Sequence, residues 1–371
     1  MTLELSSIDY QDPISAFARL ADDPFAMLMH GKGERYSYIC AFPAETMVWS
    51  GGEEAEPPLK VMTEMLSALG FERQEDFPPF CGGWAGLLSY ELGRSVLPKL
   101  RDGPPRSSWP DLALGLYDQV IAFDHQAKTV MSFDWNWRKT PKPSLKEALC
   151  VGGVCAPHRK GRLSQSSPQL REMRSAYEEK VQRVIDYVHA GDCFQANLSQ
   201  AFEFKLKPEV SPYDLLVRLD RDSAAPFSAF FRLEDHALVS NSPERFLKIR
   251  GGASSELSVT THPIKGTRPR GKTQVEDQRN ARALEMSEKD RAENLMIVDL
   301  MRNDLSRVCQ AGSVKVPKLN ALESFANVHH LVSQVDGVLA EGRRPMDLIR
   351  AAFPGGSITG APKIRAMQII A

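Results

Sequence analysis

The spacing of apolar and polar residues predicts mixed α and β structure along the whole chain. Between residues 175 and 188, apolar side chains recur at helical spacing, at Tyr177, Val181, Val184, Ile185 and Val188. Ser175 and Glu178 have the spacing of a capping box, and Gly191 has the position of a helix stop. The pattern predicts one helix with a single apolar stripe.

The strand signals lie on both sides of the chain's midpoint. Apolar and polar residues alternate from Phe194 to Ser199, which predicts a strand with one polar face. Gln195 and Asn197 lie on that face, and the pattern leaves open whether it lines a pocket or faces solvent. Further strands are predicted over residues 229–246 and 256–261. The glycine-rich run Phe80–Tyr90 is typical of a buried strand whose backbone approaches a neighbour closely.

Residues 277–307 have the pattern of a largely buried helix. Asp290, Glu293 and Asp304 share one face of it by i, i+3, i+4 spacing. Carboxylates on a buried face need a partner, and two kinds remain open. One is a metal ion. The other is an ion pair with an arginine of the same segment, Arg291, Arg302 or Arg307.

Composition narrows the class of protein. The 371 residues are 42% hydrophobic and 25% charged with a formal net charge of −1, as in ordinary globular proteins, so nothing electrostatic favours nucleic acid or membrane as a partner. The N-terminus lacks a signal-peptide pattern and no apolar run reaches membrane-spanning length, which predicts a cytoplasmic protein. Residues 138–169 shift to Lys, Pro, Gly and Ser and are predicted to be a linker between residues 1–137 and 170–371.

The stretch Pro263–Thr267 carries the strongest chemical signal, because it places Lys265 in what reads as a tight polar loop. We expect the cationic neighbours to lower the pKa of Lys265, namely His262, Arg268, Arg270 and Lys272. A neutral lysine is a nucleophile that forms covalent bonds to substrates. The alternative is a solvated surface lysine.

Residues 353–363 read as a glycine-rich loop that leads into a helix, with Pro362 near its first position. Such a helix start offers free N–H groups to a carboxylate, although it can equally be a plain cap. The sequence stops inside this helix without a C-cap signal, which predicts a fragment.

These motifs, in this order, resemble those of the chorismate-utilising enzymes. The matching stretches are Gly191–Leu198, Ser242–Phe246, Pro263–Thr267, Asp290–Leu300, His330–Ser333 and Phe353–Lys363. The first half, with Arg35–Tyr38 and Trp109–Asp111, is similar to the family's more variable N-terminal part. Anthranilate synthases usually carry alanine at the position of Lys265, and isochorismate synthases lysine at that of Gln195. The resemblance is therefore to the branch that makes 4-amino-4-deoxychorismate for folate.

The resemblance implies an α+β fold in which two antiparallel sheets pack as a sandwich with helices outside. It makes residues 1–137 the N-terminal region and residues 170–371 the chorismate-binding catalytic region. In the family a further C-terminal stretch supplies a substrate-binding arginine and a second carboxylate for Mg²⁺. That part is apparently missing here.

By the same resemblance, Lys265 attacks chorismate covalently and Glu244 is the general acid and base. Glu293 holds Mg²⁺. The implied substrate-binding residues are Gln195, Thr267, His330, Thr359, Gly360 and Lys363. A possible tryptophan pocket, for which core packing is the alternative, consists of Tyr36, Ser37, Pro226, Phe227 and Ser228.

The family also implies a partner, a glutamine amidotransferase subunit that supplies ammonia, since this chain shows no amidotransferase nucleophile motif. Two alternatives to the para-amino activity remain. One is anthranilate synthase component I. The other is a truncated, non-catalytic paralogue that binds the amidotransferase.

Overall fold

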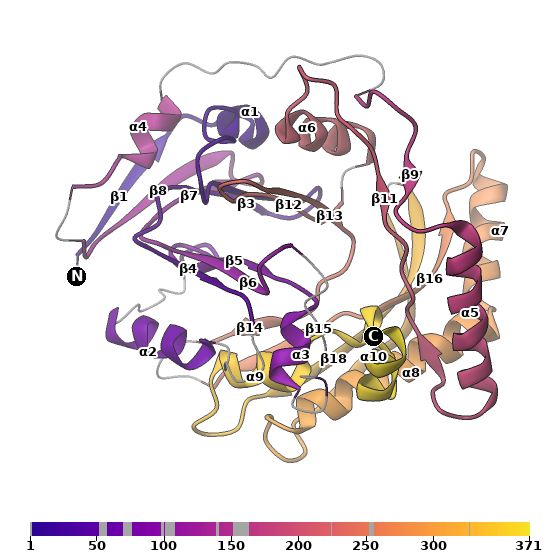
Figure 1. Ribbon diagram of the computed structural model, residues 1–371. Helices are drawn as coiled ribbons and strands as arrows, with labels where there is room; N and C mark the ends of the chain where they lie inside the picture. Colours follow the sequence, from indigo (N-terminus) through magenta and orange to yellow (C-terminus); the bar gives the residue numbers. More distant parts are fainter. Residues whose placement is uncertain are drawn as a thin grey trace. The chain divides into compact units, whose positions relative to one another are not determined.

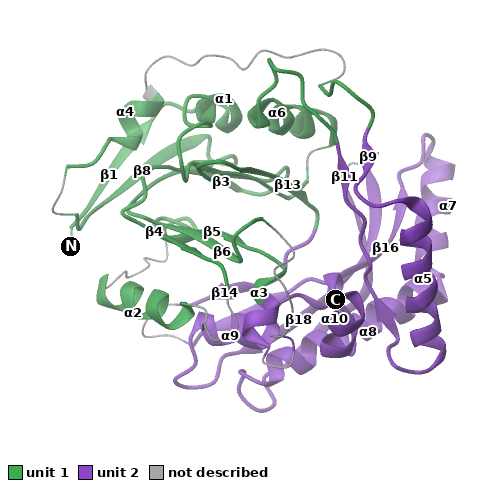
Figure 2. Cartoon of the chain, in the orientation of Figure 1, with its two compact units in different colours: residues 1–92, 105–167, 204–243 green, residues 93–104, 168–203, 244–371 purple. Residues whose placement is uncertain are grey.

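The computed structural model describes residues 2–51, 58–69, 76–97, 100, 108–138, 141–150, 163–223, 225–251, 256–325 and 327–371. The chain forms two compact units (Figure 2). Unit 1 comprises residues 1–92, 105–167 and 204–243, and unit 2 comprises residues 93–104, 168–203 and 244–371. No helix in the described part of the chain is both long and apolar enough to span a membrane.

Unit 1 is built on a seven-stranded sheet in the order β1-β8-β7-β3-β2-β12-β13 (Figure 1). Its strands are β1 Thr2–Ile8, β2 Met27–His30, β3 Tyr36–Cys40, β7 Gln119–Asp124, β8 Thr129–Asn136, β12 Phe227–Arg232 and β13 Ala237–Ser242. A three-stranded sheet in the order β4-β6-β5 contains β4 Glu45–Trp49, β5 Gly83–Leu88 and β6 Leu112–Tyr117. The helices of this unit are α1 Pro13–Phe17, α2 Leu59–Leu69, α4 Leu145–Cys150 and α6 Pro212–Ser223.

The two sheets of unit 1 share one apolar core, to which Tyr38 and Phe133 contribute from the large sheet and Ala113 and Tyr117 from the small one. The opposite face of the large sheet packs against α1, α4 and α6 in a second core. The close backbone approach predicted for β5 is present, because a Cβ on Gly86 would lie 2.2 Å from the carbonyl oxygen of Ala113. This unit is a sheet sandwich with helices outside, as expected.

Unit 2 contains a five-stranded sheet of β14 Lys248–Arg250, β15 Ser258–Thr261, β18 Val328–Val338, β16 Ile264–Pro269 and β17 Lys315–Ser324. Two short ribbons pair β9 Gln169–Leu170 with β11 Phe202–Glu203, and β10 Gln195–Ala196 with β19 Gly360–Ala361. Its helical segments are α5 Arg174–His189, α7 Gln274–Glu285, α8 Glu288–Ser306, α9 Pro345–Ala352, η2 Gly356–Ile358 and α10 Lys363–Ile370, and α3 Leu92–Val96 begins at the unit boundary. Apolar residues of α8 and α9, among them Ile297, Met301 and Leu348, pack with Val259 and Val335 of the sheet.

Every strand pairing among the described residues is antiparallel. The α+β class and the antiparallel sheets predicted from the sequence are therefore confirmed.

The compact units do not follow the boundaries predicted from composition. Residues 204–243 belong to unit 1, because Ser228–Phe231 of β12 pair with Met27–His30 of β2 and so extend the large sheet. Within the predicted linker, residues 145–150 form α4, and residues 151–162 lie outside the described residues.

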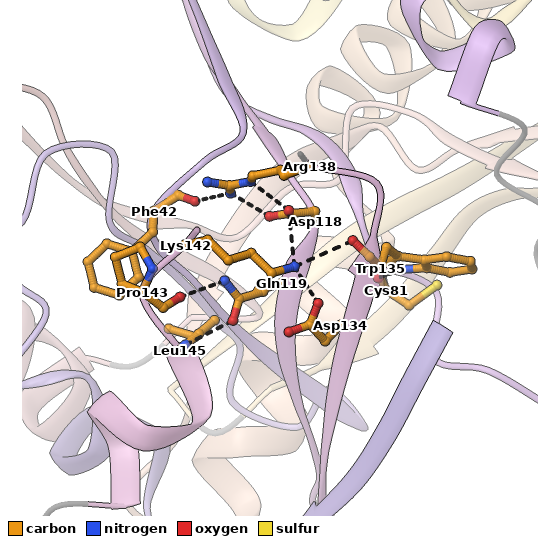
Figure 3. Close-up of polar contacts among 10 residues, drawn as sticks. All are labelled: Phe42, Cys81, Asp118, Gln119, Asp134, Trp135, Arg138, Lys142, Pro143 and Leu145. Carbon is orange, nitrogen blue, oxygen red and sulfur yellow. Dashed lines mark hydrogen bonds and ion pairs between the residues drawn. The ribbon is translucent and has the colours of Figure 1, made fainter. Parts of the chain in front are cut away.

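The beginning of that predicted linker is bound to the large sheet through a buried carboxylate (Figure 3). Asp118, fully buried, accepts hydrogen bonds from Arg138 Nε at 2.6 Å and from Lys142 Nζ at 3.2 Å. The amide of the neighbouring Gln119 donates to the carbonyl of Pro143 at 2.8 Å and accepts from the backbone N–H of Leu145 at 2.9 Å. Two opposite charges and satisfied hydrogen bonds are what a buried carboxylate requires.

Helix boundaries in unit 2 differ from the sequence pattern in two places. Helix α5 begins at Arg174 with Met173 as N-cap and without a side-chain cap, so the capping box predicted at Ser175 is wrong. Ser175 lies inside the first turn, where its hydroxyl is not at the N-cap position. The segment 277–307 is two helices, because Ser287 caps α8 by accepting from the backbone N–H of Asp290.

Candidate active site

Lys265 lies in strand β16 rather than in a loop, which corrects the interpretation of Pro263–Thr267. The strand pairs with β18, and its register shifts between Lys265 and Thr267 in a β-bulge. Gly266 has φ +76, and a Cβ there would lie 2.8 Å from Leu284 and 2.9 Å from Asp290. Only glycine fits this bulge without strain.

The surroundings of the Lys265 amine are anionic, so the predicted cluster of cations around it is wrong. Its Nζ lies 3.3 Å from Glu293 Oε1 and 3.4 Å from the carbonyl oxygen of Ser357, and the side chain is 13% exposed. The cations next to it in sequence have other partners. Arg268 pairs with Asp290 at 3.0 Å and Arg270 with Asp277 at 2.8 Å. Each of these arginines therefore has its own carboxylate, Asp290 on α8 for Arg268 and Asp277 on α7 for Arg270.

Glu244 lies close enough to Lys265 for their charges to interact. Its Oε1 accepts a hydrogen bond of 2.5 Å from the hydroxyl of Ser357. Burial raises the pKa of Glu244, against the opposing effects of the Ser357 hydrogen bond, the Lys265 charge and the backbone N–H of Ile264. A carboxyl group whose pKa is raised retains its proton at higher pH, as a general acid must.

Gln195 and Asn197 both point to this cluster, so their polar face does not simply face solvent, and a pocket lined by them stays a prediction. Gln195 Nε2 donates to Glu293 Oε1 at 3.0 Å, and Asn197 Nδ2 donates to the carbonyl oxygen of Ser357 at 2.9 Å. The strand predicted over 194–199 shortens to Gln195–Ala196, because its only partner is the two-residue strand β19. The carbonyl oxygen of the Gln195 side chain is buried and has no hydrogen-bond partner among the described residues.

Thr267 and His330 form a second polar pair on neighbouring strands. Thr267 Oγ1 and His330 Nδ1 are 2.9 Å apart, and His330 is buried on β18. Burial lowers the pKa of His330, against a hydrogen bond with the backbone of Gly266 and the charge of Glu323. A lowered pKa favours a neutral imidazole, which can accept one hydrogen bond and donate another.

The segment 359–363 is bound inside unit 2 through its own polar groups. Thr359, fully buried, donates from Oγ1 to the carbonyl of Gly355 at 3.1 Å. The ammonium of Lys363 binds Asp304 at 2.5 Å and the carbonyl of Ala352 at 2.6 Å. A Cβ on Gly360 would lie 2.1 Å from the carbonyl oxygen of Gln195, so this backbone abuts the residue that contacts Glu293.

Asp290, Glu293 and Asp304 therefore pair with cations from other elements, and the ion pairs predicted for them with Arg291 and Arg302 are wrong, whereas the charge of Arg307 does act on Asp304. Asp290 binds Arg268, Glu293 binds Lys265, and Asp304 binds Lys363. The shared face was predicted correctly. Helical spacing defines that face but cannot identify what packs on it.

Glu293 and Gln195 bring oxygen atoms of the kind that Mg²⁺ prefers to the cluster. Mg²⁺ is commonly held by one or two carboxylates together with substrate oxygens and water. The Glu293 side chain is 28% exposed and accepts from the amide nitrogen of Gln195, whose own side-chain oxygen has no partner among the described residues. In the described part of the chain, no group of three or more His, Cys, Asp and Glu side chains is arranged to hold a metal ion. A magnesium site at Glu293 stays a prediction.

Ser357 is the residue of this cluster that the sequence motifs did not single out. It contacts Glu244 through its hydroxyl, and Lys265 and Asn197 through its carbonyl. The available signal was its position beside Gly355 and Gly356, where a small polar residue follows two glycines.

The residues of the possible tryptophan pocket lie together in unit 1, where Tyr36 and Ser37 are on β3 and Phe227 and Ser228 on β12. The Ser37 hydroxyl contacts His30 Nδ1 at 2.8 Å and His125 Nε2 at 2.7 Å. The Ser228 hydroxyl donates to Asn241 at 2.7 Å. Pro226 is adjacent, since a Cβ on Gly31 would lie 1.7 Å from its carbonyl oxygen. The tryptophan interpretation stays a prediction.

Comparison with known proteins gives a consistent result. The profile of a family described as chorismate binding enzyme matches residues 24–371. The chain is 41% identical to aminodeoxychorismate synthase component 1 of Salmonella typhimurium, over 95% of this chain and 79% of that protein. It is 35% identical to anthranilate synthase component 1 of Thermus thermophilus, over 98% and 80%. The crystal structure of anthranilate synthase component I from Streptococcus pneumoniae matches with a TM-score of 0.75 and 26% identity, over 91% of this chain and 77% of that one.

Proposed function

The chain belongs to the chorismate binding enzyme family, and from this premise we propose that it converts chorismate and ammonia to 4-amino-4-deoxychorismate. Relatives named aminodeoxychorismate synthase component 1 support this activity, which provides the precursor of p-aminobenzoate in folate synthesis. The observation that carries the proposal is an amine, Lys265, beside a carboxyl group of raised pKa, Glu244. A nucleophile and a general acid at one site suit the displacement of a hydroxyl group.

In the first step, the neutral amine of Lys265 forms a bond to C2 of chorismate, both conjugated ring double bonds shift by one position, and the C4–O bond breaks. Glu244 gives its proton to the departing hydroxyl, which leaves as water. The contact of 3.3 Å to Glu293 supports a fixed direction for the amine before it loses its proton.

In the second step, ammonia forms a bond to C4, both double bonds shift back and the C2–N bond breaks, which returns the electron pair to Lys265. Glu244, now a carboxylate, takes a proton from the new ammonium group and is restored. The sum is chorismate plus ammonia giving the amino product plus water, so atoms and charge balance.

The remaining residues of the cluster bind and orient in this proposal. Glu293 and Gln195 would hold Mg²⁺, which when bound neutralises a carboxylate of chorismate. Thr267 and His330 would lie near the departing hydroxyl. Thr359, Gly360 and Lys363 would line the carboxylate side of the site, with Lys363 acting through Asp304 and the backbone rather than through a free ammonium.

Ammonia would come from a glutamine amidotransferase subunit, because free ammonia is a small fraction of ammonium at neutral pH. The name component 1, which the relatives carry, supports a second component for this chain. Assay with added ammonium salt makes the test independent of that subunit.

The decisive experiment is intact-mass analysis of the protein after incubation with chorismate and Mg²⁺ in the absence of ammonia. We expect an adduct on Lys265, and on addition of ammonium the para-amino product. Lys265→Ala should lose both, with turnover reduced more than about 100-fold. Lys289→Ala, an exposed lysine of α8, is the matched control and should behave as the parent protein.

Other outcomes identify the alternatives. A fluorescent ortho-amino product would identify an anthranilate synthase. This alternative is supported by the 35% identity to anthranilate synthase component 1 of Thermus thermophilus. Chorismate left unconsumed by a protein that still binds an amidotransferase would identify a non-catalytic paralogue. Para-amino turnover with Lys265 unmodified would exclude the covalent step.

A further inference from the structure

The two reactive groups of the proposed function meet at one residue. The hydroxyl of Ser357 donates to Glu244 Oε1 at 2.5 Å, and its carbonyl oxygen lies 3.4 Å from Lys265 Nζ. We propose that Ser357 is a positioning residue that holds the general acid Glu244 and the nucleophile Lys265 in a fixed relation to each other. This inference rests on the proposed function. Its side chain directs the acid, and its backbone directs the amine.

The backbone around Ser357 is held from several sides, as a positioning role requires. A Cβ on Gly356 would lie 2.7 Å from Leu300 Cδ2 of α8, and one on Gly355 would lie 3.1 Å from the ring of Phe246. The two glycines therefore let the segment pack closely on its neighbours. Asn197, which directly follows β10, donates from Nδ2 to the Ser357 carbonyl at 2.9 Å.

The hydroxyl contact determines where the proton of Glu244 resides. Because Ser357 donates to Oε1, that oxygen acts as an acceptor, and the acid proton belongs on the other carboxyl oxygen. The same hydrogen bond stabilises the carboxylate and opposes the effect of burial on this group. Ser357 thus limits how tightly Glu244 holds the proton that it must transfer.

The carbonyl contact acts separately from the hydroxyl. It accepts from Asn197 and from Lys265, and a backbone carbonyl has two lone pairs for such contacts. Replacing Ser357 by alanine removes the hydroxyl and leaves the carbonyl in place. The variant therefore tests the link to Glu244 without deleting the link to Lys265.

The test compares Ser357→Ala and Ser357→Thr with the parent protein in the chorismate and ammonium assay across pH. For Ser357→Ala we expect kcat to fall about 10-fold or more, the effect of one hydrogen bond to a charged group, with KM changed less than about 2-fold. The high-pH limb of kcat should move to higher pH, because the carboxylate loses a stabilising donor. Lys265 of β16 is a charged group that acts on Glu244, it pairs in turn with Glu293 of α8, and neither residue is altered in these variants.

Two variants make the comparison specific. Ser357→Thr keeps the hydroxyl and should restore kcat and the pH limb to near the parent values. Ser306→Ala removes an exposed hydroxyl that donates to the backbone carbonyl of Arg302 at 2.7 Å, and should match the parent. If thermal unfolding shows that Ser357→Ala is not folded, Ser357→Cys provides the same comparison, because its thiol is only a weak donor.

The inference is overturned if Ser357→Ala keeps the parental kcat and pH limb while the parent makes the para-amino product. It is also overturned if Ser357→Thr loses as much activity as Ser357→Ala, since the hydroxyl would then be irrelevant. A parent protein that makes no para-amino product overturns the proposed function itself, which is a different and separately visible result.

Discussion

Lys265, Glu244 and Glu293 are ordinary residue types, and their contacts make them chemically distinct. Glu293 Oε1 lies 3.3 Å from Lys265 and accepts from Gln195 at 3.0 Å, while Glu244 is enclosed enough for burial to raise its pKa. Two glutamates near one lysine thus have different properties. One is open to a cation, and the other is suited to hold a proton.

The proposed metal role of Glu293 predicts a specific change on substitution. Glu293→Gln removes a negative charge and one carboxylate oxygen from the donor set, so Mg²⁺ binding should weaken about 10-fold or more. Calorimetric titration of Mg²⁺ with chorismate present measures this directly, and the Mg²⁺ concentration for half-maximal turnover should rise in parallel.

The control for this change is Asp299→Asn on the same helix, where the Asp299 side chain is 76% exposed and pairs with Arg302. It should leave Mg²⁺ binding unaltered. Equal Mg²⁺ affinity in Glu293→Gln and Asp299→Asn would remove Glu293 from the metal site.

At the scale of elements, helix α8 connects the parts of the site, because three of its carboxylates bind cations on two other elements, β16 and α10. Asp290 binds Arg268 of β16, Glu293 binds Lys265 of the same strand, and Asp304 binds Lys363 at the start of α10. Buried Asn294 adds a hydrogen bond to the carbonyl of Leu331 on β18 at 3.1 Å. These contacts fix the positions of α8, of strands β16 and β18, and of the 353–363 segment relative to one another.

The Asp304–Lys363 pair should contribute strongly to the stability of unit 2. The two side chains are only 4% and 8% exposed, and burial raises the pKa of Asp304 and lowers that of Lys363 against the effect of their pairing. Lys363→Met leaves a buried carboxylate unpaired and should lower the free energy of unfolding by about 3–5 kcal/mol. Urea denaturation measures this change.

A surface pair and a double variant complete that experiment. Arg302→Ala breaks the exposed ion pair with Asp299 and should change stability by less than about 1 kcal/mol. Lys363→Met combined with Asp304→Leu should recover much of the loss, because no charge is then buried alone. A loss no larger for Lys363→Met than for Arg302→Ala would contradict a structural role for the buried pair.

For the whole molecule, three histidines are expected to make the free energy of unfolding fall as the pH falls. Burial lowers the pKa of His125, His262 and His330 from the ordinary value of 6.5. As pH falls through that value, the unfolded chain binds these protons more readily than the folded chain. The free energy of unfolding should therefore fall between pH 7.5 and 5.5, by at most about 1.4 kcal/mol per pH unit for each histidine.

Denaturation at a series of pH values measures this slope. His125→Asn should reduce it, because one of the three groups no longer titrates, whereas replacement of exposed His189 on α5 by Asn should leave it unchanged. Glu244 and Asp304, whose pKa values are raised by burial, act in the opposite direction at lower pH and are the same in all these variants. A slope that is unaffected by His125→Asn would be inconsistent with the lowered pKa.

The spacing of apolar and polar residues was sufficient to predict several helices and strands. The helix that ends before Gly191, the carboxylate face of α8 and the strands β12, β13 and β15 were predicted from spacing, since a side chain's face depends only on the repeat of its own element. Spacing alone predicted mixed α and β structure, whereas the α+β class came from the resemblance of the motifs to a family. Boundaries were less accurate, because Met173 rather than Ser175 begins α5 and Ser287 divides the segment 277–307.

The sequence by itself determined which residues carry the chemistry: the lysine of Pro263–Thr267, the glutamate of Ser242–Phe246 and the carboxylates of 290–304. Only the tertiary structure decided their partners. Around Lys265 the structure has Glu293, Glu244 and the Ser357 carbonyl instead of the predicted cations. The ammonium of Lys363 binds Asp304. The physical reason is that contacts between residues far apart in the chain depend on how strands and helices pack, and no local repeat encodes that packing.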